Sequence, residues 1–269
     1  MRSIATVMMV LSQLHRAHAF LPTPPHALVA ASATASVNPA VIFFSGANAR
    51  MPKTMYSDFL DRMQKNNLTI YDAAGLSEQK LDDVVNEALQ THSEVSLLSH
   101  SLGSAGLLRA ANFHSSCKKV VMLDPVRSLN DDGFYLKHCT RALMVRATNA
   151  HEWNNARRGV PFLLGFNLQP HHVTLRSDAV GKGHLTVIDA KGFGHGDICD
   201  TAVATTLHYT GLGRGFEDRD HVDEYRQWVA DVVADFINTP DDDMPLNHGT
   251  PPPPKDDPPF KVPYTIVSE

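Results

Sequence analysis

The sequence predicts an α/β protein in which a mostly parallel central sheet is flanked by helices. Between residues 39 and 238, short runs of apolar and often β-branched residues alternate with longer segments whose apolar residues recur at helical spacing. Strands that alternate with helices are the pattern of right-handed crossover units, which build parallel sheets. A segment of this length suits one such domain.

The expected elements follow from these patterns. The run 40–44 is entirely apolar, as a strand buried on both faces must be, and later runs share this character. The expected strands are 40–44, 68–71, 94–98, 119–123, 141–145 and 185–188. The expected helices are 56–63, 80–91, 104–113 and 225–237.

The composition excludes several classes of protein. The chain has 269 residues, 43% of them hydrophobic and 20% charged, with a formal net charge of -5. A nucleic-acid-binding chain would carry a basic stripe, so no nucleic-acid partner is expected. The three cysteines, Cys117, Cys139 and Cys199, include no CxxC pair. We predict free thiols in a reducing compartment, with no metal site and no cofactor.

The first 38 residues are predicted to be a targeting segment. Residues 4–14 are apolar but too few to span a bilayer, and 17–19 match a small-x-small cleavage site. Residues 20–38 contain no acidic residue, as is typical of a transit peptide. The junction Ala-His-Ala-Phe-Leu-Pro at 17–22 resembles the Ala-x-Ala-Phe-x-Pro junction of plastid precursors in algae with complex plastids. Plastid import through a signal plus transit peptide is favoured, and secretion is the alternative.

The last segment, 239–269, is predicted to be a disordered or extended tail. It is rich in Pro and Asp, with an acidic run at 241–243 and a proline run at 251–254. Such a composition buries too little apolar surface to offset the entropy lost on ordering. A role as a PxxP-like ligand is a less favoured alternative.

The most informative motif is Ser99-His100-Ser101-Leu102-Gly103. It lies directly after an expected strand and before an expected helix, which is the context of the G-x-S-x-G nucleophile elbow of α/β-hydrolases. The nucleophile of such an elbow occupies a strained turn, so the residues two positions to either side must be small. We therefore predict an α/β-hydrolase fold with Ser101 as the nucleophile. A strand-helix turn with incidental serines is the simpler alternative.

His195 is the predicted base. In α/β-hydrolases the histidine comes last along the chain, and the Gly-Phe-Gly-His-Gly-Asp segment 192–197 follows the last expected strand. The glycines would let this loop fold back over the elbow, where the imidazole could take and return the proton of the nucleophile. Metal binding by His195 with Asp197 is the less favoured interpretation, because no further ligand lies at a suitable spacing in the sequence.

Two carboxylates compete for the role of the acid that orients the histidine. Asp124 follows the expected strand 119–123 and precedes Pro125, which ends that strand sharply at the sheet edge where ligands bind. Glu152 follows the next expected strand and is the alternative acid. Position alone favours Asp124.

The backbone is expected to supply an oxyanion hole. The Leu102 amide lies at the start of the helix that follows the elbow, where N–H groups lack helical partners. The second donor should come from the loop 45–48 after the first strand, with the Ala47 amide as the best candidate.

Three segments together resemble the chlorophyllase family. The elbow is similar to that family's Gly-His-Ser-Arg-Gly, and residues 123–126 match its Asp-Pro-Val segment, which carries the triad acid. Residues 190–200 are similar to the aromatic-Gly-His-x-Asp-Met-x-Asp segment that carries the triad histidine. The likeness is spread over 41–237 and is patchy outside these motifs. Ser99 and Leu102 stand where the family has Gly and Arg, and the family's His-Gly of the first loop is Ser-Gly here.

The resemblance implies a serine carboxylester hydrolase that cleaves the phytyl ester of chlorophyll to chlorophyllide and phytol through an acyl-enzyme. An apolar pigment substrate of this kind makes peripheral contact with a thylakoid or envelope membrane an expected feature. A short cap-like insertion between the last two expected strands is apolar and could form the substrate pocket. The pocket candidates are Trp153, Phe162, Leu163 and Phe166. Simple packing of this loop explains its apolar residues equally well.

Two other functions stay open at this point. One is a plastid lipase or esterase that acts on acyl lipids. The other is a non-catalytic protein of the hydrolase fold that binds a pigment or a lipid. The sequence leaves the oligomeric state open.

Overall fold

The computed structural model describes residues 38–128, 136, 138–139, 141–147, 168–170, 184–190, 193–209, 219–240 and 265–268. All of them belong to Ala35–Glu269, the second of the two units into which the chain divides. Nearly all of the predicted targeting segment and most of the predicted cap lie outside the described residues, as do residues 241–264 of the predicted tail.

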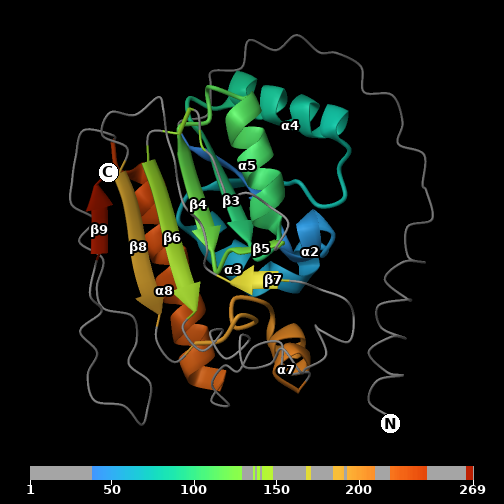
Figure 1. Ribbon diagram of the computed structural model, residues 1–269, viewed down its shortest axis with the longest axis vertical. Helices are drawn as coiled ribbons and strands as arrows, with labels where there is room; N and C mark the ends of the chain where they lie inside the picture. Colours follow the sequence, from blue (N-terminus) through green and yellow to red (C-terminus); the bar gives the residue numbers. More distant parts are fainter. Residues whose placement is uncertain are drawn as a thin grey trace. The chain divides into compact units, whose positions relative to one another are not determined.

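A seven-stranded sheet with the order β2-β1-β3-β4-β6-β8-β9 forms the centre of this unit (Figure 1). Its strands are β1 (Ala40–Phe44), β2 (Thr69–Asp72), β3 (Val95–His100), β4 (Lys119–Leu123), β6 (Arg141–Ala147), β8 (His184–Ala190) and β9 (Thr265–Ser268). Every neighbouring pair is parallel except β8 and β9, which are antiparallel. The predicted α/β class with a mostly parallel sheet is therefore confirmed.

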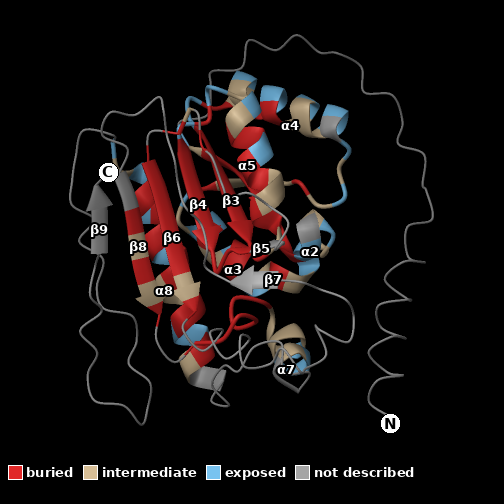
Figure 2. Cartoon of the chain, in the orientation of Figure 1, coloured by how far each residue is buried: buried red, intermediate tan, exposed pale blue. Residues whose placement is uncertain are grey.

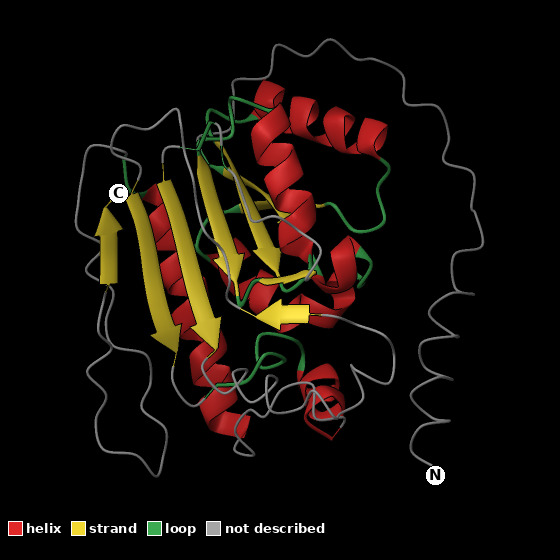
Figure 3. Ribbon diagram, in the orientation of Figure 1, coloured by secondary structure: helices red, strands yellow, loops and turns green. Residues whose placement is uncertain are grey.

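Helices cover both faces of the sheet (Figure 3). They are α2 (Gly46–Ala49), the 3-10 helix η1 (Lys53–Tyr56), α3 (Ser57–Lys65), α4 (Glu78–Thr91), α5 (Gly103–Phe113), α7 (Thr201–Tyr209) and α8 (Arg219–Asn238). None of the helices within the described ranges is long and apolar enough to cross a bilayer.

The sheet is buried because alternate residues of its strands face two separate apolar cores. Val41 and Phe43 of β1 belong to a core shared with α3 and α8. Ile42 and Phe44 belong to a core on the other side, shared with α4 and α5. Figure 2 shows the result, with the central strands buried along their length and exposed residues on the outer side of α4. This double burial explains why the central strands read as continuous apolar runs.

The order of the strands contains a switch point. From β1 the chain moves outward to β2, then returns to place β3 on the other side of β1, and continues through β4, β6 and β8. The connections after β1 and after β3 therefore diverge to opposite sides. In open α/β sheets, ligands bind outside the carboxyl ends of the two strands at such a point. Those two ends carry the Ser45 loop and the Ser101 turn.

Each expected strand occurs with ends shifted by about two residues or less, and four helices match the expected ones. Helix α8 begins at Arg219 rather than 225. The sequence reading missed α2, α7 and a separate two-stranded sheet in which β5 (Val126–Ser128) pairs with β7 (Leu168–Pro170). The helix α2 and the strands β5 and β7 have only three or four residues, too few for periodicity to reveal them, and α7 is rich in Thr and Ala and lacks a clear apolar stripe.

Part of the predicted tail is described by the structure. Residues Thr265–Ser268 form the extended strand β9 and pair with β8, a pairing that the prediction of a disordered or extended tail did not include. Their β-branched side chains favour a strand, and β8 would otherwise present an unpaired edge. The average composition of 239–269 concealed this local signal.

Two buried cations hold the carboxyl end of α8 at the amino end of the sheet. Lys119 Nζ, on β4, donates to the carbonyls of Ile237 and Thr239 at 2.7 and 3.0 Å and to Glu94 at 3.2 Å. Arg141, on β6, donates to the carbonyls of Thr239 and Pro240. Cations are favourable at a helix carboxyl end, where carbonyls lack helical partners.

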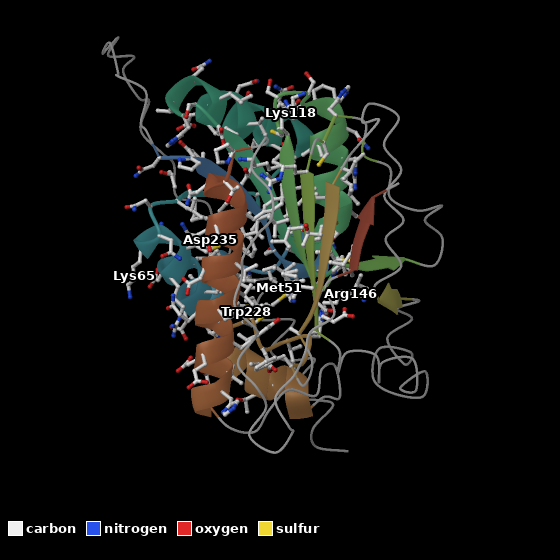
Figure 4. The ribbon with its side chains drawn as sticks, turned by 90° about the vertical axis from the view of Figure 1, so that its left-hand side faces the viewer. Met51, Lys65, Lys118, Arg146, Trp228 and Asp235 are labelled. Atoms are coloured by element: carbon white, nitrogen blue, oxygen red, sulfur yellow. The ribbon has the colours of Figure 1, made fainter. Side chains whose placement is uncertain are left out.

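Replacing Lys119 with methionine tests this anchor. Lys119→Met keeps the length of the side chain but removes the donor to the buried Ile237 carbonyl, whereas the Thr239 carbonyl keeps its hydrogen bond from Arg141, so we expect a loss of about 2–3 kcal/mol of unfolding free energy. The exposed neighbour Lys118, at the same end of the sheet (Figure 4), provides the control, and Lys118→Met should change stability by about 0.5 kcal/mol or less. Urea denaturation measures both. Equal stability of the two variants would contradict the assignment.

Candidate active site

The predicted nucleophile lies at the switch point in a strained turn. Ser101 joins β3 to α5 with a φ of 56°, in the left-handed region that non-glycine residues rarely occupy. Its amide donates to the Leu123 carbonyl at 3.1 Å, and its carbonyl accepts from the Val126 amide at 3.3 Å. Leu123 is the last residue of β4, and Val126 is the first residue of β5. The end of β4 and the start of β5 thus hold the strained turn through both its amide and its carbonyl.

The start of α5 lies against the end of β1. A Cβ added at Gly103 would lie 2.3 Å from the Phe44 carbonyl oxygen and 2.4 Å from that of Ser45. Only glycine allows this approach. It brings the helix start, which includes Leu102, next to the Ser45 loop, so the two segments predicted to carry the oxyanion hole are adjacent.

Ser99 replaces the usual first glycine of the elbow, and the structure shows how it is accommodated. Its side chain is fully buried. Ser104 Oγ donates to the Ser101 carbonyl at 2.8 Å and lies 3.1 Å from Ser99 Oγ. Since the one hydroxyl proton of Ser104 is used on the carbonyl, Ser99 is the donor to Ser104. The extra hydroxyl is therefore satisfied within the turn.

The three residues predicted to act together form one hydrogen-bonded chain. His195 Nε2 lies 2.8 Å from Ser101 Oγ, and His195 Nδ1 lies 2.5 Å from Asp124 Oδ2. All three side chains are buried. Along the chain, Ser101 lies 94 residues and Asp124 lies 71 residues before His195. This arrangement can activate a hydroxyl as a nucleophile, with the carboxylate fixing the imidazole tautomer.

Asp124 is oriented by the next strand. Its Oδ1 accepts from the Ala147 amide at 3.0 Å, which leaves Oδ2 for the imidazole. Its own amide donates to the Val145 carbonyl at 2.6 Å. The residue adopts a φ of 41°, so the chain turns sharply at the end of β4. The carboxylate is thereby aimed along the carboxyl edge of the sheet.

The loop that carries His195 is fixed by a buried arginine that the sequence reading missed. Arg226, fully buried on α8, donates to the carbonyls of Asp197 and Cys199. Asp197 Oδ2 accepts from the Gly194 amide at 2.7 Å, so this carboxylate helps to shape the loop. A signal was present, because Arg226 lies on the same helical stripe as the apolar Val222, Val229 and Val233.

The amides predicted for the oxyanion hole have suitable surroundings. Ala47 is exposed with a φ of 53°, and Leu102 is the residue that caps the start of α5. Within the part of the chain that the structure describes, neither amide donates to a protein acceptor. The Gly46 amide is occupied instead, because it donates to Tyr56 Oη at 3.0 Å.

Tyr56 and His100 join the site from positions that the sequence reading did not single out. Tyr56 Oη lies 2.8 Å from His100 Nδ1, and His100 Nε2 lies 2.9 Å from the His195 carbonyl oxygen. Burial, and then the neighbouring His195, lower the pKa of His100 from 6.5 to about 3. Burial raises the pKa of Tyr56 well above 10. Both side chains are therefore neutral near pH 7.

Several predicted residues lie outside the described part of the chain. They are the alternative acid Glu152 and the pocket candidates Trp153, Phe162, Leu163 and Phe166. Among the described residues, no group of three or more His, Cys, Asp or Glu side chains could hold a metal ion. The three cysteines are buried, and none of them forms a disulfide within the described residues.

Comparison of the chain with models of known protein families gives no match, and comparison with curated proteins gives none either.

Glycine substitutions on α5 test the close approach at the elbow. Gly103→Ala would force two backbones apart, so we expect a loss of about 4 kcal/mol or more in unfolding free energy, or failure to fold. Gly106→Ala is the matched control, since its Cβ would meet only side-chain atoms, a ring carbon of Phe44 at 3.0 Å, and no backbone. It should change stability by about 1 kcal/mol or less. Denaturation midpoints of the two variants and the wild-type chain provide the measurement. A Gly103→Ala variant as stable as the wild-type chain would contradict the steric argument.

Proposed function

We propose that this chain is a serine carboxylester hydrolase of the α/β-hydrolase type. The observation that carries the proposal is the hydrogen-bonded chain Ser101–His195–Asp124 at a strained strand-to-helix turn. The fold assignment draws on the six parallel strands, on the elbow after β3, and on the order nucleophile, acid, histidine along the chain.

In the proposed reaction, Ser101 Oγ attacks the ester carbonyl carbon while its proton passes to His195 Nε2. The carbonyl oxygen becomes an oxyanion, for which the amides of Leu102 and Ala47 are the proposed donors. His195 then protonates the departing alcohol oxygen, which leaves an acyl-enzyme on Ser101. Water repeats the sequence and releases the acid, with Asp124 stabilising the imidazolium in each half-reaction.

The proposed substrate class is an ester with a bulky apolar alcohol, of the kind that a chlorophyllase cleaves. Support comes from the resemblance of the elbow, of 123–126 and of 190–200 to that family. In that case the products are chlorophyllide and phytol, and the enzyme acts at the surface of a membrane that contains the pigment. A lipase or esterase of acyl lipids shares the same site and is the second candidate. A binding protein that has lost turnover is the third.

A substrate panel separates these functions. The full-length chain is offered chlorophyll a, a galactolipid and p-nitrophenyl butyrate, beside Ser101→Ala. We expect chlorophyllide release from the wild-type chain and none from the variant. Release of fatty acid alone would support the lipase, and binding of pigment without turnover would support the binding protein. Equal activity of the two chains on every substrate would refute the proposed nucleophile.

Asp124→Asn tests the proposed acid. With the side-chain oxygen facing the Ala147 amide, the new NH₂ group would face His195 Nδ1 and hold the imidazole in the wrong tautomer. Turnover should then fall by about 10⁴, with the fold intact. Steady-state kinetics and circular dichroism measure both properties. If Glu152→Gln produces this loss and Asp124→Asn does not, Glu152 is the acid.

Plastid import is proposed for the residues that precede the domain. The support is the apolar segment, the cleavage pattern and the Phe20 junction. Residues 1–38 fused to a fluorescent reporter should reach the plastid in an alga with a complex plastid, and Phe20→Ala should prevent import. Fluorescence microscopy of the two fusions provides the measurement. Secretion of the unaltered fusion would argue for the alternative address.

A further inference from the structure

His100 connects the two loops that complete the site. Its side chain is buried, and its ring lies 4.7 Å from the ring of His195. One ring nitrogen contacts Tyr56 Oη at 2.8 Å, and the other contacts the His195 carbonyl oxygen at 2.9 Å. Since His100 directly precedes Ser101, a single side chain joins the elbow to both loops.

The direction of each hydrogen bond can be assigned. The His195 carbonyl oxygen can only accept, so His100 Nε2 carries the proton and donates. Because the ring is neutral, Nδ1 has no proton and accepts from the Tyr56 hydroxyl. Tyr56 Oη in turn accepts from the Gly46 amide at 3.0 Å. The chain therefore runs from Gly46 through Tyr56 and His100 to His195, with every donor pointing the same way.

Both ends of this chain are backbone segments that need an external constraint. At one end, the Gly46 amide precedes Ala47, whose φ of 53° is uncommon outside glycine. At the other end, His195 lies between Gly194 and Gly196, so its backbone keeps one conformation only through hydrogen bonds, and those of Arg226 and Asp197 hold residues on either side of it. Hydrogen bonds that polarise one another in a buried site strengthen such a constraint.

We infer that His100 is a positioning residue that sets the proposed oxyanion donor and the proposed base at fixed places relative to Ser101. This inference rests on the proposed function. His100 touches neither the nucleophile oxygen nor the carboxylate; it acts through the Gly46 amide, by way of Tyr56, and through the His195 carbonyl. Catalysis is sensitive to such placement, because errors of about 1 Å in a site reduce rates by about 10².

Two variants of His100 separate the two links. In His100→Asn, the side-chain oxygen can take the place of Nδ1 and accept from Tyr56, but nothing reaches the His195 carbonyl. In His100→Gln, the longer amide can donate where Nε2 did. We expect kcat on p-nitrophenyl butyrate to fall about 10²-fold in the asparagine variant, with KM nearly unchanged. The kcat of the glutamine variant should be about tenfold higher than that of the asparagine variant.

The molecule contains a matched control at the other end of the sheet. Tyr71 Oη lies 3.2 Å from His92 Nε2, and His92 Nδ1 contacts the Asn38 carbonyl oxygen at 2.8 Å. Here too, a tyrosine hydroxyl contacts a buried histidine, and the histidine contacts a backbone carbonyl. His92→Asn and Tyr71→Phe should lower the unfolding temperature and leave kcat unchanged.

Kinetics are measured on the full-length chain, and kcat is expressed per active site titrated with a fluorophosphonate. Misfolded molecules then do not count, so a merely structural role of His100 would leave kcat unchanged. Affinity for a trifluoromethyl ketone, which resembles the tetrahedral intermediate, should fall in parallel with kcat/KM. Where His100→Asn does not fold, Tyr56→Phe breaks the same chain at its middle and should also lower kcat per titrated site.

The outcomes distinguish this inference from the proposed function. If the wild-type chain does not react with the fluorophosphonate at Ser101, the proposed function fails. If it reacts, and the His100 and Tyr56 variants retain wild-type kcat per titrated site, the positioning role is overturned. The role is also overturned if the glutamine variant is no better than the asparagine variant while the His92 and Tyr71 controls lose kcat equally.

Discussion

The contact between the start of α5 and the end of β1 is the constraint on which the rest of the site depends. No side chain fits between Gly103 and the carbonyls of Phe44 and Ser45. Because the helix begins so close to the sheet, the chain must turn within two residues after β3, which places Ser101 at a φ of 56°. Strain of this kind persists only where the surroundings over-determine it. Here the hydrogen bonds to both sides of the end of β4 and the hydroxyls of Ser99 and Ser104 supply that support.

A second constraint is that the polar groups of the site are buried and must be hydrogen-bonded. A buried polar group without a partner costs about 1–3 kcal/mol, and a buried charge costs more. The carboxylate of Asp124 meets this requirement with one amide and one imidazole, and Arg226 meets it with loop carbonyls and the side chain of Asp223. The same bonds that satisfy these groups also fix their orientation. Stability and geometry at this edge of the sheet therefore have a common origin.

The sequence predicted those features that local patterns encode. Continuous apolar runs identified the parallel strands, and Ser101, Asp124 and His195 were indicated by motif, turn chemistry and chain order. Tyr56 and Arg226 were not, because their partners lie 44, 27 and 29 residues away and no spacing rule joins them. His100 lay inside the quoted motif, yet its partners are 44 and 95 residues distant. The strand β9 was hidden because proline and aspartate dominate the average composition around it.

The tyrosine–histidine pairs at the two ends of the sheet show why a residue type does not by itself assign a role. Away from the switch point, Tyr71 and His92 join β2 to the residues before β1 and β3. At the carboxyl end, Tyr56 and His100 lie where the connections after β1 and β3 part to opposite sides. The gap that this divergence opens is what a substrate can enter. Side chains that bridge such a gap position reactive groups, whereas chemically similar side chains elsewhere only stabilise the fold.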